Sequence, residues 1–528
     1  MDAHEADYGF PFGNPDGSRS DIQSILDDFV TFAIEDFGVG LGTRETDATA
    51  RVIVGPKGSG KTMYLRRLRA AAAKNPGVFA ADIQQEVPTT AHIVKFSSLF
   101  PVAEVTEKWS VLWGRAIERS LVSFLLCHRQ VRDHLSAEQR ADLQYFATPA
   151  GGSLFPEFVA PLSAYSQLMS IVGAHTAKSW FDEYLSRDEW AALEARLGDA
   201  LAGIPPLSFY VDAVDEEYAH APMYWMQCQK GLFYRAMRLL RDPQFGGRLH
   251  LVVCVRDNVL SSVLQGEHQT RYADEPHIRR LSWNRRSISY FMDQKIDRLE
   301  SEFLTKPDAS NAMERWLGIA EVDNVARGVR EDLRSYILRH TRLLPRDIVV
   351  MGNKLSREVR FRAQEGGVLD GGRIREIVAG CALMFGNEQI ALCANHVSSD
   401  VMPRKAANRG YSDVYTDISE YRNWIVDRVR VILQGIGADR FSMEEMEIAA
   451  ELAREALGTN CDLFNILWQN GLVGYRDEPA PSTFRDVFFS MSSLDRFSMP
   501  IRPGEYVFHS CLIDAVGLRA RREPVLSF

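Results

Sequence analysis

One short segment combines closely spaced glycines with a lysine and a threonine, which are residue types that hold phosphate groups. It matches the pattern GxxxxGK followed by Ser or Thr, and consists of Gly55, Pro56, Lys57, Gly58, Ser59, Gly60, Lys61 and Thr62. Glycines let backbone N–H groups turn toward phosphate oxygens, and the N-terminus of a following helix adds partial positive charge. In such a loop Lys61 would reach the β- and γ-phosphates and Thr62 would bind Mg²⁺. The segment therefore predicts a nucleotide site.

A cluster of carboxylates follows an apolar run at 207–211, about 150 residues downstream of the glycine-rich segment. Asp212 stands at the end of the expected strand, where it would hold the magnesium shell through water. Glu216 is the first candidate, and Asp215 the second, for the carboxylate that orients and polarises an attacking water. Clustered acids after a strand are also typical of a cap for the next helix. Together with an intact phosphate loop, they favour a role in hydrolysis.

The elements that must position these residues follow from the apolar pattern. Short apolar runs predict buried strands, and apolar residues three and four apart predict helices. The expected strands are 51–54, 92–96, 207–212, 249–255 and 278–281, with helices at 61–75 and 222–241. Strands that alternate with helices predict an α/β fold, in which a parallel sheet carries helices on both faces.

The rest of the chain is expected to be mostly helical, and its last part mixes helices with a ribbon. Expected helices at 442–457 and 461–470, a loop at 476–483 and a strand near 506–509 follow the order of a winged-helix domain. We divide the chain into an N-terminal helical segment 1–50, a core 51–285 with a helical insertion at about 105–200, a helical lid 286–355, a helical linker region 356–438 and a winged-helix-like domain 439–528.

The acidic sequence FYVDAVDE at 209–216 resembles the acidic motif of STAND-type ATPases, the NACHT and KAP groups among them. These groups belong to the broader AAA+-like class. The resemblance implies a parallel-sheet P-loop ATPase core with a helical lid and a C-terminal winged-helix domain. It also implies a switch that holds ATP with Mg²⁺, assembles into oligomers and hydrolyses ATP to reset.

The same resemblance assigns roles to residues near the ends of the later strands. Arg256 or Asn258, at the tip of the strand 249–255, would sense the γ-phosphate. Arg279 or Arg280 would act in trans as an arginine finger that supplies charge to a neighbouring subunit's γ-phosphate.

A further segment, HTRLLPRDIVV at 340–350, resembles the Pro-Arg motif in the lid of AAA+ ATPases, including the replication-initiator and origin-recognition types. The resemblance implies that Arg346 contacts the nucleotide from the lid. Pro345 suits the first position of a helix, because the N–H that it lacks has no partner inside the helix there.

Composition places this 528-residue chain among globular proteins, since 46% of its residues are hydrophobic and 25% are charged. Its apolar runs are shorter than the roughly 20 residues of a membrane helix, and its start, MDAHEADYGF, does not resemble a signal peptide. Seven scattered cysteines without a CxxC pair predict reduced thiols rather than disulfides or a zinc site. We expect a cytoplasmic protein without a membrane partner.

The charge distribution disfavours DNA as the main partner. The net charge is −9, and residues 439–528 contain nine Arg, no Lys and fourteen acidic residues. The helix expected at 461–470, which would read DNA in a winged helix, has no basic residue. A contact with protein is the favoured role of this region.

These observations lead to three hypotheses. The first is an ATP-hydrolysing switch that forms homo-oligomers and controls a partner effector, because similar bacterial P-loop ATPases often belong to anti-phage defence modules. The second is a DNA-acting, initiator-like AAA+ ATPase, which would show DNA-stimulated turnover that falls steeply with salt. The third is an assembly scaffold that binds ATP and hardly hydrolyses it.

Overall fold

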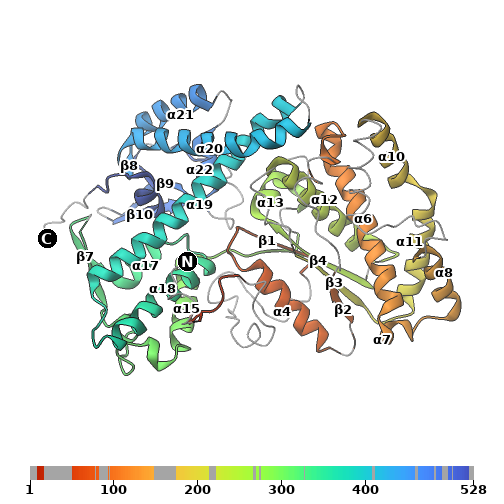
Figure 1. Ribbon diagram of the computed structural model, residues 1–528, viewed down its shortest axis with the longest axis horizontal. Helices are drawn as coiled ribbons and strands as arrows, with labels where there is room; N and C mark the ends of the chain where they lie inside the picture. Colours follow the sequence, from red (N-terminus) through yellow and green to blue (C-terminus); the bar gives the residue numbers. More distant parts are fainter. Residues whose placement is uncertain are drawn as a thin grey trace.

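The computed structural model describes residues 9–16, 50–82, 93, 96–147, 174–212, 222–406, 411–457, 462–480, 483–489 and 498–521, apart from 76, 78, 246, 266–268, 273–274, 326 and 502–503. A parallel sheet and its helices form one side of the molecule, and later helices with a small second sheet form the other (Figure 1). The long helix α19, Gly371–Ala406, runs diagonally through the later group and extends toward the sheet side. Most of the N-terminal segment 1–50, which was expected to be helical, and the carboxylates Asp215 and Glu216 lie outside the described residues.

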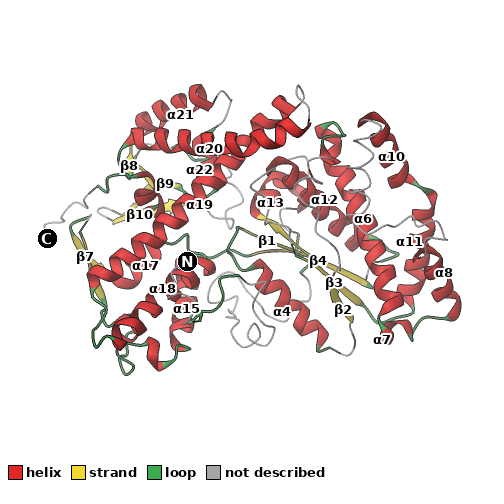
Figure 2. Ribbon diagram, viewed as in Figure 1, coloured by secondary structure: helices red, strands yellow, loops and turns green. Residues whose placement is uncertain are grey.

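Five strands of the described chain form one sheet in the order β2-β3-β4-β1-β5, and every neighbouring pair is parallel. They are β1 (Val52–Gly55), β2 (Phe79–Asp82), β3 (Leu207–Val211), β4 (Leu249–Arg256) and β5 (Ile278–Arg280). The register sets Gly55 beside Arg256. The predicted α/β class with a parallel sheet is confirmed, and Figure 2 shows how much of the remaining chain is helical.

Alternate side chains of these strands enter two separate cores, because successive side chains of a strand point to opposite faces. Ile53 packs with α4 (Lys61–Ala73) on one face. Val52 and Val54 enter the core on the other face, which α12 (Pro222–Arg241) helps to build. Helices therefore cover both faces, as the alternation of strands and helices predicts.

The described part of the region between β2 and β3 is mostly helical, as expected. Its described helices are α6 (Val102–Cys127), α7 (Arg129–Arg132), α8 (Ala137–Ala147), α10 (Ala174–Ser186) and α11 (Asp188–Ala202). Helix α6 packs closely along α12, where a Cβ on Gly231 would lie 2.6 Å from the Trp109 Cβ. These helices belong to the same core as one face of the sheet.

The strand expected at 92–96 is wrong. Ile93 and Phe96 are helical and fully buried, and the Phe96 ring lies 4.8 Å from that of Trp109. Two apolar residues three positions apart can share one face of a helix, and so short an apolar run does not distinguish a helix from a strand. The edge position beside β3 is taken instead by β2.

The region expected to form the lid is mostly helical. It contains α15 (Arg285–Asp297), η3 (Ser301–Phe303), α16 (Ala312–Leu317), α17 (Leu333–Arg339) and α18 (Pro345–Gln364). A hairpin of β6 (Glu321–Asn324) and β7 (Val329–Asp332) interrupts these helices, so the expectation of helix throughout 286–355 is wrong there. In β6, buried Val322 and Asn324 alternate with exposed residues, which is the period of a strand.

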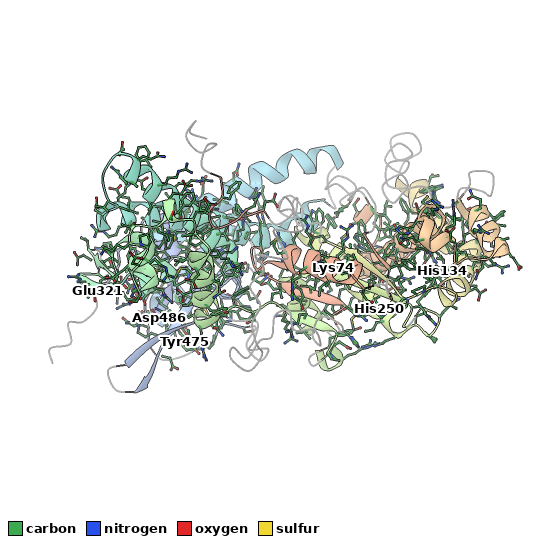
Figure 3. The ribbon with its side chains drawn as sticks, turned by 90° about the horizontal axis from the view of Figure 1, so that it is seen from below. Lys74, His134, His250, Glu321, Tyr475 and Asp486 are labelled. Carbon is green, nitrogen blue, oxygen red and sulfur yellow. The ribbon has the colours of Figure 1, made fainter. Side chains whose placement is uncertain are left out.

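The C-terminal elements form a second, antiparallel sheet. In the described chain α20 (Tyr411–Ile436) is followed by β8 (Arg440–Phe441), α21 (Met443–Leu457), α22 (Leu463–Gln469), β9 (Val473–Ala480), β10 (Thr483–Phe488), β11 (Tyr506–Phe508) and α23 (Ser510–Val516). The strand order is β10-β9-β11-β8. The loop expected at 476–483 is largely strand, because Arg476 pairs with Asp486 across the ribbon with an Nε–Oδ1 distance of 3.0 Å. Figure 3 shows this ribbon, marked by Tyr475 and Asp486, at the edge of the molecule.

Helix α19 is the one described helix with the length and apolar character of a membrane span, at Gly371–Val397. Half of the apolar window is buried within the protein, and the helix packs against α18, α20 and α23. A core helix of a folded domain passes the same test, so this composition is weak evidence for a membrane.

Candidate functional site

The glycine-rich loop, residues 55–62, connects β1 to α4, as the sequence predicts. Gly58 and Gly60 have φ of 92° and 93°, a left-handed conformation that residues with a side chain rarely adopt. The Lys61 ammonium folds back and donates hydrogen bonds to the carbonyl oxygens of Gly55 at 2.8 Å and Pro56 at 3.1 Å. The backbone thus holds this buried cation directly at the loop.

Several features of this loop suit an anionic ligand. Helix α4 has no acidic residue in its first turn, and its N-cap residue, Gly60, supplies no side-chain hydrogen bond to the N–H groups there. A Cβ on Gly60 would meet nothing within 4 Å. The buried Ser59 hydroxyl makes no hydrogen bond with the described residues. These donors fit a chain of phosphates.

The tip of β4 lies beside the loop because β4 is the neighbour of β1. Arg256 is 5% exposed, and its backbone N–H donates to the Gln229 Oε1 at 3.1 Å. Burial raises the pKa of Asp257, whereas the nearby charges of Lys61 and Arg256 act to lower it. Sequence reasoning missed Asp257, although its place directly after a strand tip was a usable signal.

The acidic residues are only partly described. Asp212 directly follows β3 and is exposed, at the same sheet edge as the ends of β4 and β1. The carboxyl ends of parallel strands meet at one edge, which is where ligands bind in open α/β sheets. Asp215 and Glu216 stay predictions. Thr62, the second residue of α4, is half-buried.

Helix α18 begins directly against the glycine-rich loop, although about 290 residues separate them. The Arg346 backbone N–H donates to the Gly58 carbonyl oxygen at 3.2 Å. A Cβ on Gly58 would lie 3.1 Å from the Arg346 Cβ, closer than most Cβ contacts, so a side chain there would press on the start of α18. On the other side, the Trp283 indole N–H donates to the Ser59 carbonyl oxygen at 3.0 Å. The structure thus brings together the loop, the expected Pro-Arg segment and Trp283.

A carboxylate on α19 faces two cations of this assembly. The Glu388 Oε1 lies 2.8 Å from the Lys57 Nζ and 3.8 Å from an Arg346 guanidinium nitrogen. Burial acts to raise the pKa of Glu388, but the hydrogen bond from Lys57 and the charges of Arg342, Lys57 and Arg346 hold it below its usual value. Glu388 carried no signal in the sequence, because it lies inside an ordinary helix.

The start of α18 is held by a buried ion pair. Asp347 is fully buried and accepts two hydrogen bonds from the Arg342 guanidinium, at 2.9 and 2.6 Å, and one from its backbone N–H at 2.9 Å. This bidentate geometry fixes the turn that precedes α18. It therefore also fixes where Arg346 meets the loop.

The remaining candidates, Arg279 and Arg280, lie in β5 at the edge of the sheet and are half-buried. Their action on a second subunit stays a prediction. Among the described residues no group of three His, Cys, Asp or Glu side chains is placed to hold a metal ion, and the described cysteines form no disulfide.

Comparison of the chain with protein-family models, with curated proteins and with solved structures found no match in any of the three. The function is therefore inferred from the geometry of this site. That geometry consists of a helix N-terminus with a glycine at its N-cap, a buried lysine, a neighbouring strand tip with charged residues, and a second helix that contacts the loop.

Proposed function

We propose that this protein is an ATP-binding and ATP-hydrolysing molecular switch with a P-loop core of the AAA+/STAND type. The observation that carries the proposal is the contact of Arg346 with Gly58, which brings the expected lid arginine to a glycine-rich loop with the full phosphate-binding pattern. Two segments with family-like motifs and no proximity in sequence meet at one point, as a nucleotide site between core and lid requires.

Each residue of the site would have a defined part. Lys61 would exchange its two carbonyl partners for phosphate oxygens, and the N–H groups of the loop would cradle the phosphates. Thr62 and Asp212 would hold Mg²⁺, which neutralises phosphate charge when it is bound. Glu216 or Asp215 would orient the attacking water. Arg256 would stabilise the negative charge that develops on the γ-phosphate.

The C-terminal region supports a switch more than a DNA-binding protein. Helix α22 has no basic residue, and most of its apolar side chains are buried, so it offers little for reading bases. In the ribbon, Arg476 is paired with Asp486. We propose that this winged-helix-like region contacts protein, either a second copy of the chain or a partner effector, in the cytoplasm of a bacterium that uses the module against phages.

The proposal is tested with Lys61→Ala, Glu216→Gln and, as a control, Lys74→Ala. Lys74 is an exposed lysine at the far end of the same helix (Figure 3). We expect Lys61→Ala to lose ATP binding and turnover, and Glu216→Gln to keep binding and lose at least 100-fold in turnover, a typical effect of a general base. Parental turnover in both site variants would disprove the site.

Solution mass and ATP turnover together separate the three hypotheses. A defined oligomer that forms with ATP and Mg²⁺ alone would support the switch. An increase in mass only with duplex DNA, together with DNA-stimulated turnover, would favour the initiator-like ATPase instead. Nucleotide-dependent assembly with almost no turnover would favour the scaffold.

A further inference from the structure

A single histidine on α19 joins the tip of β4 to the C-terminal elements. The His396 Nε2 lies 3.2 Å from the Asn258 side-chain nitrogen, and its Nδ1 lies 3.2 Å from the Asn470 side-chain nitrogen. Asn258 is the second residue of α13 (Asp257–Leu264), directly after the strand tip, and Asn470 is the C-cap of α22. Both contacts connect elements that are far apart in sequence.

The protonation of His396 determines how these amides are oriented. Burial, helped by the charge of Arg256, lowers the pKa of His396 to about 4, so the ring is neutral at pH 7. A neutral imidazole has one N–H donor and one acceptor nitrogen, so it cannot accept from two amide nitrogens at once. One of the two asparagines must therefore present its oxygen to the ring.

The second partner of Asn470 decides which one. The Asn470 side-chain nitrogen also donates to the Ile466 carbonyl oxygen at 2.7 Å, which holds this group as a donor toward Nδ1. The His396 Nδ1 is then the acceptor and Nε2 carries the proton. Asn258 consequently turns its carbonyl oxygen to His396 and its NH₂ group away from it. The orientation of an amide at the strand tip is thus set from the C-terminal elements.

We propose that His396 is a positioning residue of the nucleotide site, which orients Asn258 and makes that orientation depend on Asn470. The inference rests on the proposed function, because it assigns the sensing of the γ-phosphate to the tip of β4. An amide in the correct orientation offers a donor to a phosphate oxygen, and the opposite orientation offers an acceptor that repels it. Hydrolysis would thereby be coupled to the position of the C-terminal region.

The test uses Asn470→Ala, which lies outside the nucleotide site, with Asn465→Ala as the matched control. Asn465 is a half-buried asparagine of α22, like Asn470, and its side chain accepts a hydrogen bond from the Met499 backbone N–H at 3.1 Å. We expect Asn470→Ala to lower kcat for ATP by three- to tenfold, as for the loss of one hydrogen bond, with KM changed less than twofold. Asn465→Ala should keep parental kcat.

Variants of His396 test whether Asn470 acts through this histidine. His396→Ala should lower kcat at least as much, and the double variant with Asn470→Ala should lower it no further, because the two residues act through one path. His396→Gln should recover part of the loss, since its amide offers one donor and one acceptor. Parental kcat in Asn470→Ala, or additive losses in the double variant, would overturn the inference.

A second measurement is independent of catalysis. Amide hydrogen exchange of residues 257–264 without nucleotide should become three- to tenfold faster in Asn470→Ala and stay parental in Asn465→Ala. Unchanged exchange would overturn the inference even in an active enzyme. Faster exchange in a protein that never hydrolyses ATP would instead disprove the proposed function and retain the connection through His396. Exchange at the other helices shows whether each variant is folded.

Discussion

The contact between the glycine-rich loop and α18 can be tested by the change Gly58→Ala. Gly58 has φ of 92°, and its added Cβ would lie 3.1 Å from the Arg346 Cβ and 3.4 Å from its Cδ. Gly60→Ala is the matched control, because Gly60 has φ of 93° in the same loop and nothing lies within 4 Å of its added Cβ. Both variants carry the same backbone strain, and only one presses on α18.

The difference between the variants can be worked out from these contacts. A left-handed alanine costs roughly 1–2 kcal/mol at either position, and this term cancels. In Gly58→Ala the first turn of α18 must also move away, which weakens the 3.2 Å hydrogen bond from the Arg346 N–H to the Gly58 carbonyl oxygen. Such a bond contributes about 1 kcal/mol, which corresponds to roughly a fivefold change in an equilibrium constant.

The assay is amide hydrogen exchange in the absence of nucleotide, followed at the peptide that contains Arg346. We expect this amide to exchange about five times faster in Gly58→Ala than in Gly60→Ala, because its acceptor has moved. Equal exchange in the two variants would show that α18 does not rest on the loop. The lid interpretation of residues 286–355 would then lose its main support.

Three other predictions concern charges. Glu388→Gln should tighten ATP binding about three- to fivefold in a nucleotide titration, because Lys57 and Arg346 lose a half-exposed counter-charge. Weaker binding would contradict this, and so would the same change in the exposed control Glu376→Gln. Asp347→Asn leaves the buried Arg342 with a weaker partner and should destabilise the protein by about 3 kcal/mol. The unfolding temperature should fall accordingly, and an unchanged temperature would refute this prediction. Burial lowers the pKa of three histidines to about 4 in the folded protein, against about 6.5 in the unfolded chain. Their neutral rings stabilise the fold above pH 6.5, and this stability is lost as the pH falls toward 4. Each histidine should lower the free energy of unfolding by about 2 kcal/mol by pH 5, and equal unfolding temperatures at pH 7 and pH 5 would argue against it. The histidines are His340, His396 and His509.

The glycine-rich loop and most of the sheet could be predicted from the sequence. The loop is a contiguous motif between an apolar run and a helix, so local residue types carry the whole signal. Strands such as β1 and β3 are uninterrupted apolar runs, because a parallel sheet buries both faces. The predicted helix at 222–241 agrees with α12 at both ends.

Local patterns failed where the competing structures share the same residues. The run at 92–96 is apolar in either conformation, and the described residues Ile93 and Phe96 are helical, with the Phe96 ring packed against Trp109. The ribbon at 476–483 contains prolines and acids typical of a loop, yet pairing with a partner strand extends it through Ala480. Both outcomes depend on neighbours that the local sequence does not specify.

The sequence alone determined where the glycine-rich loop lies, where four of the five strands of its sheet lie, and that a Pro-Arg segment follows far downstream. Only the tertiary structure decided that Arg346 sits on Gly58, that Glu388 faces Lys57, and that His396 joins Asn258 to Asn470. The reason is physical. Spacing along the chain governs which side chains share a face of one element, whereas contacts between elements depend on how whole helices pack, and that packing is set by every buried side chain at once.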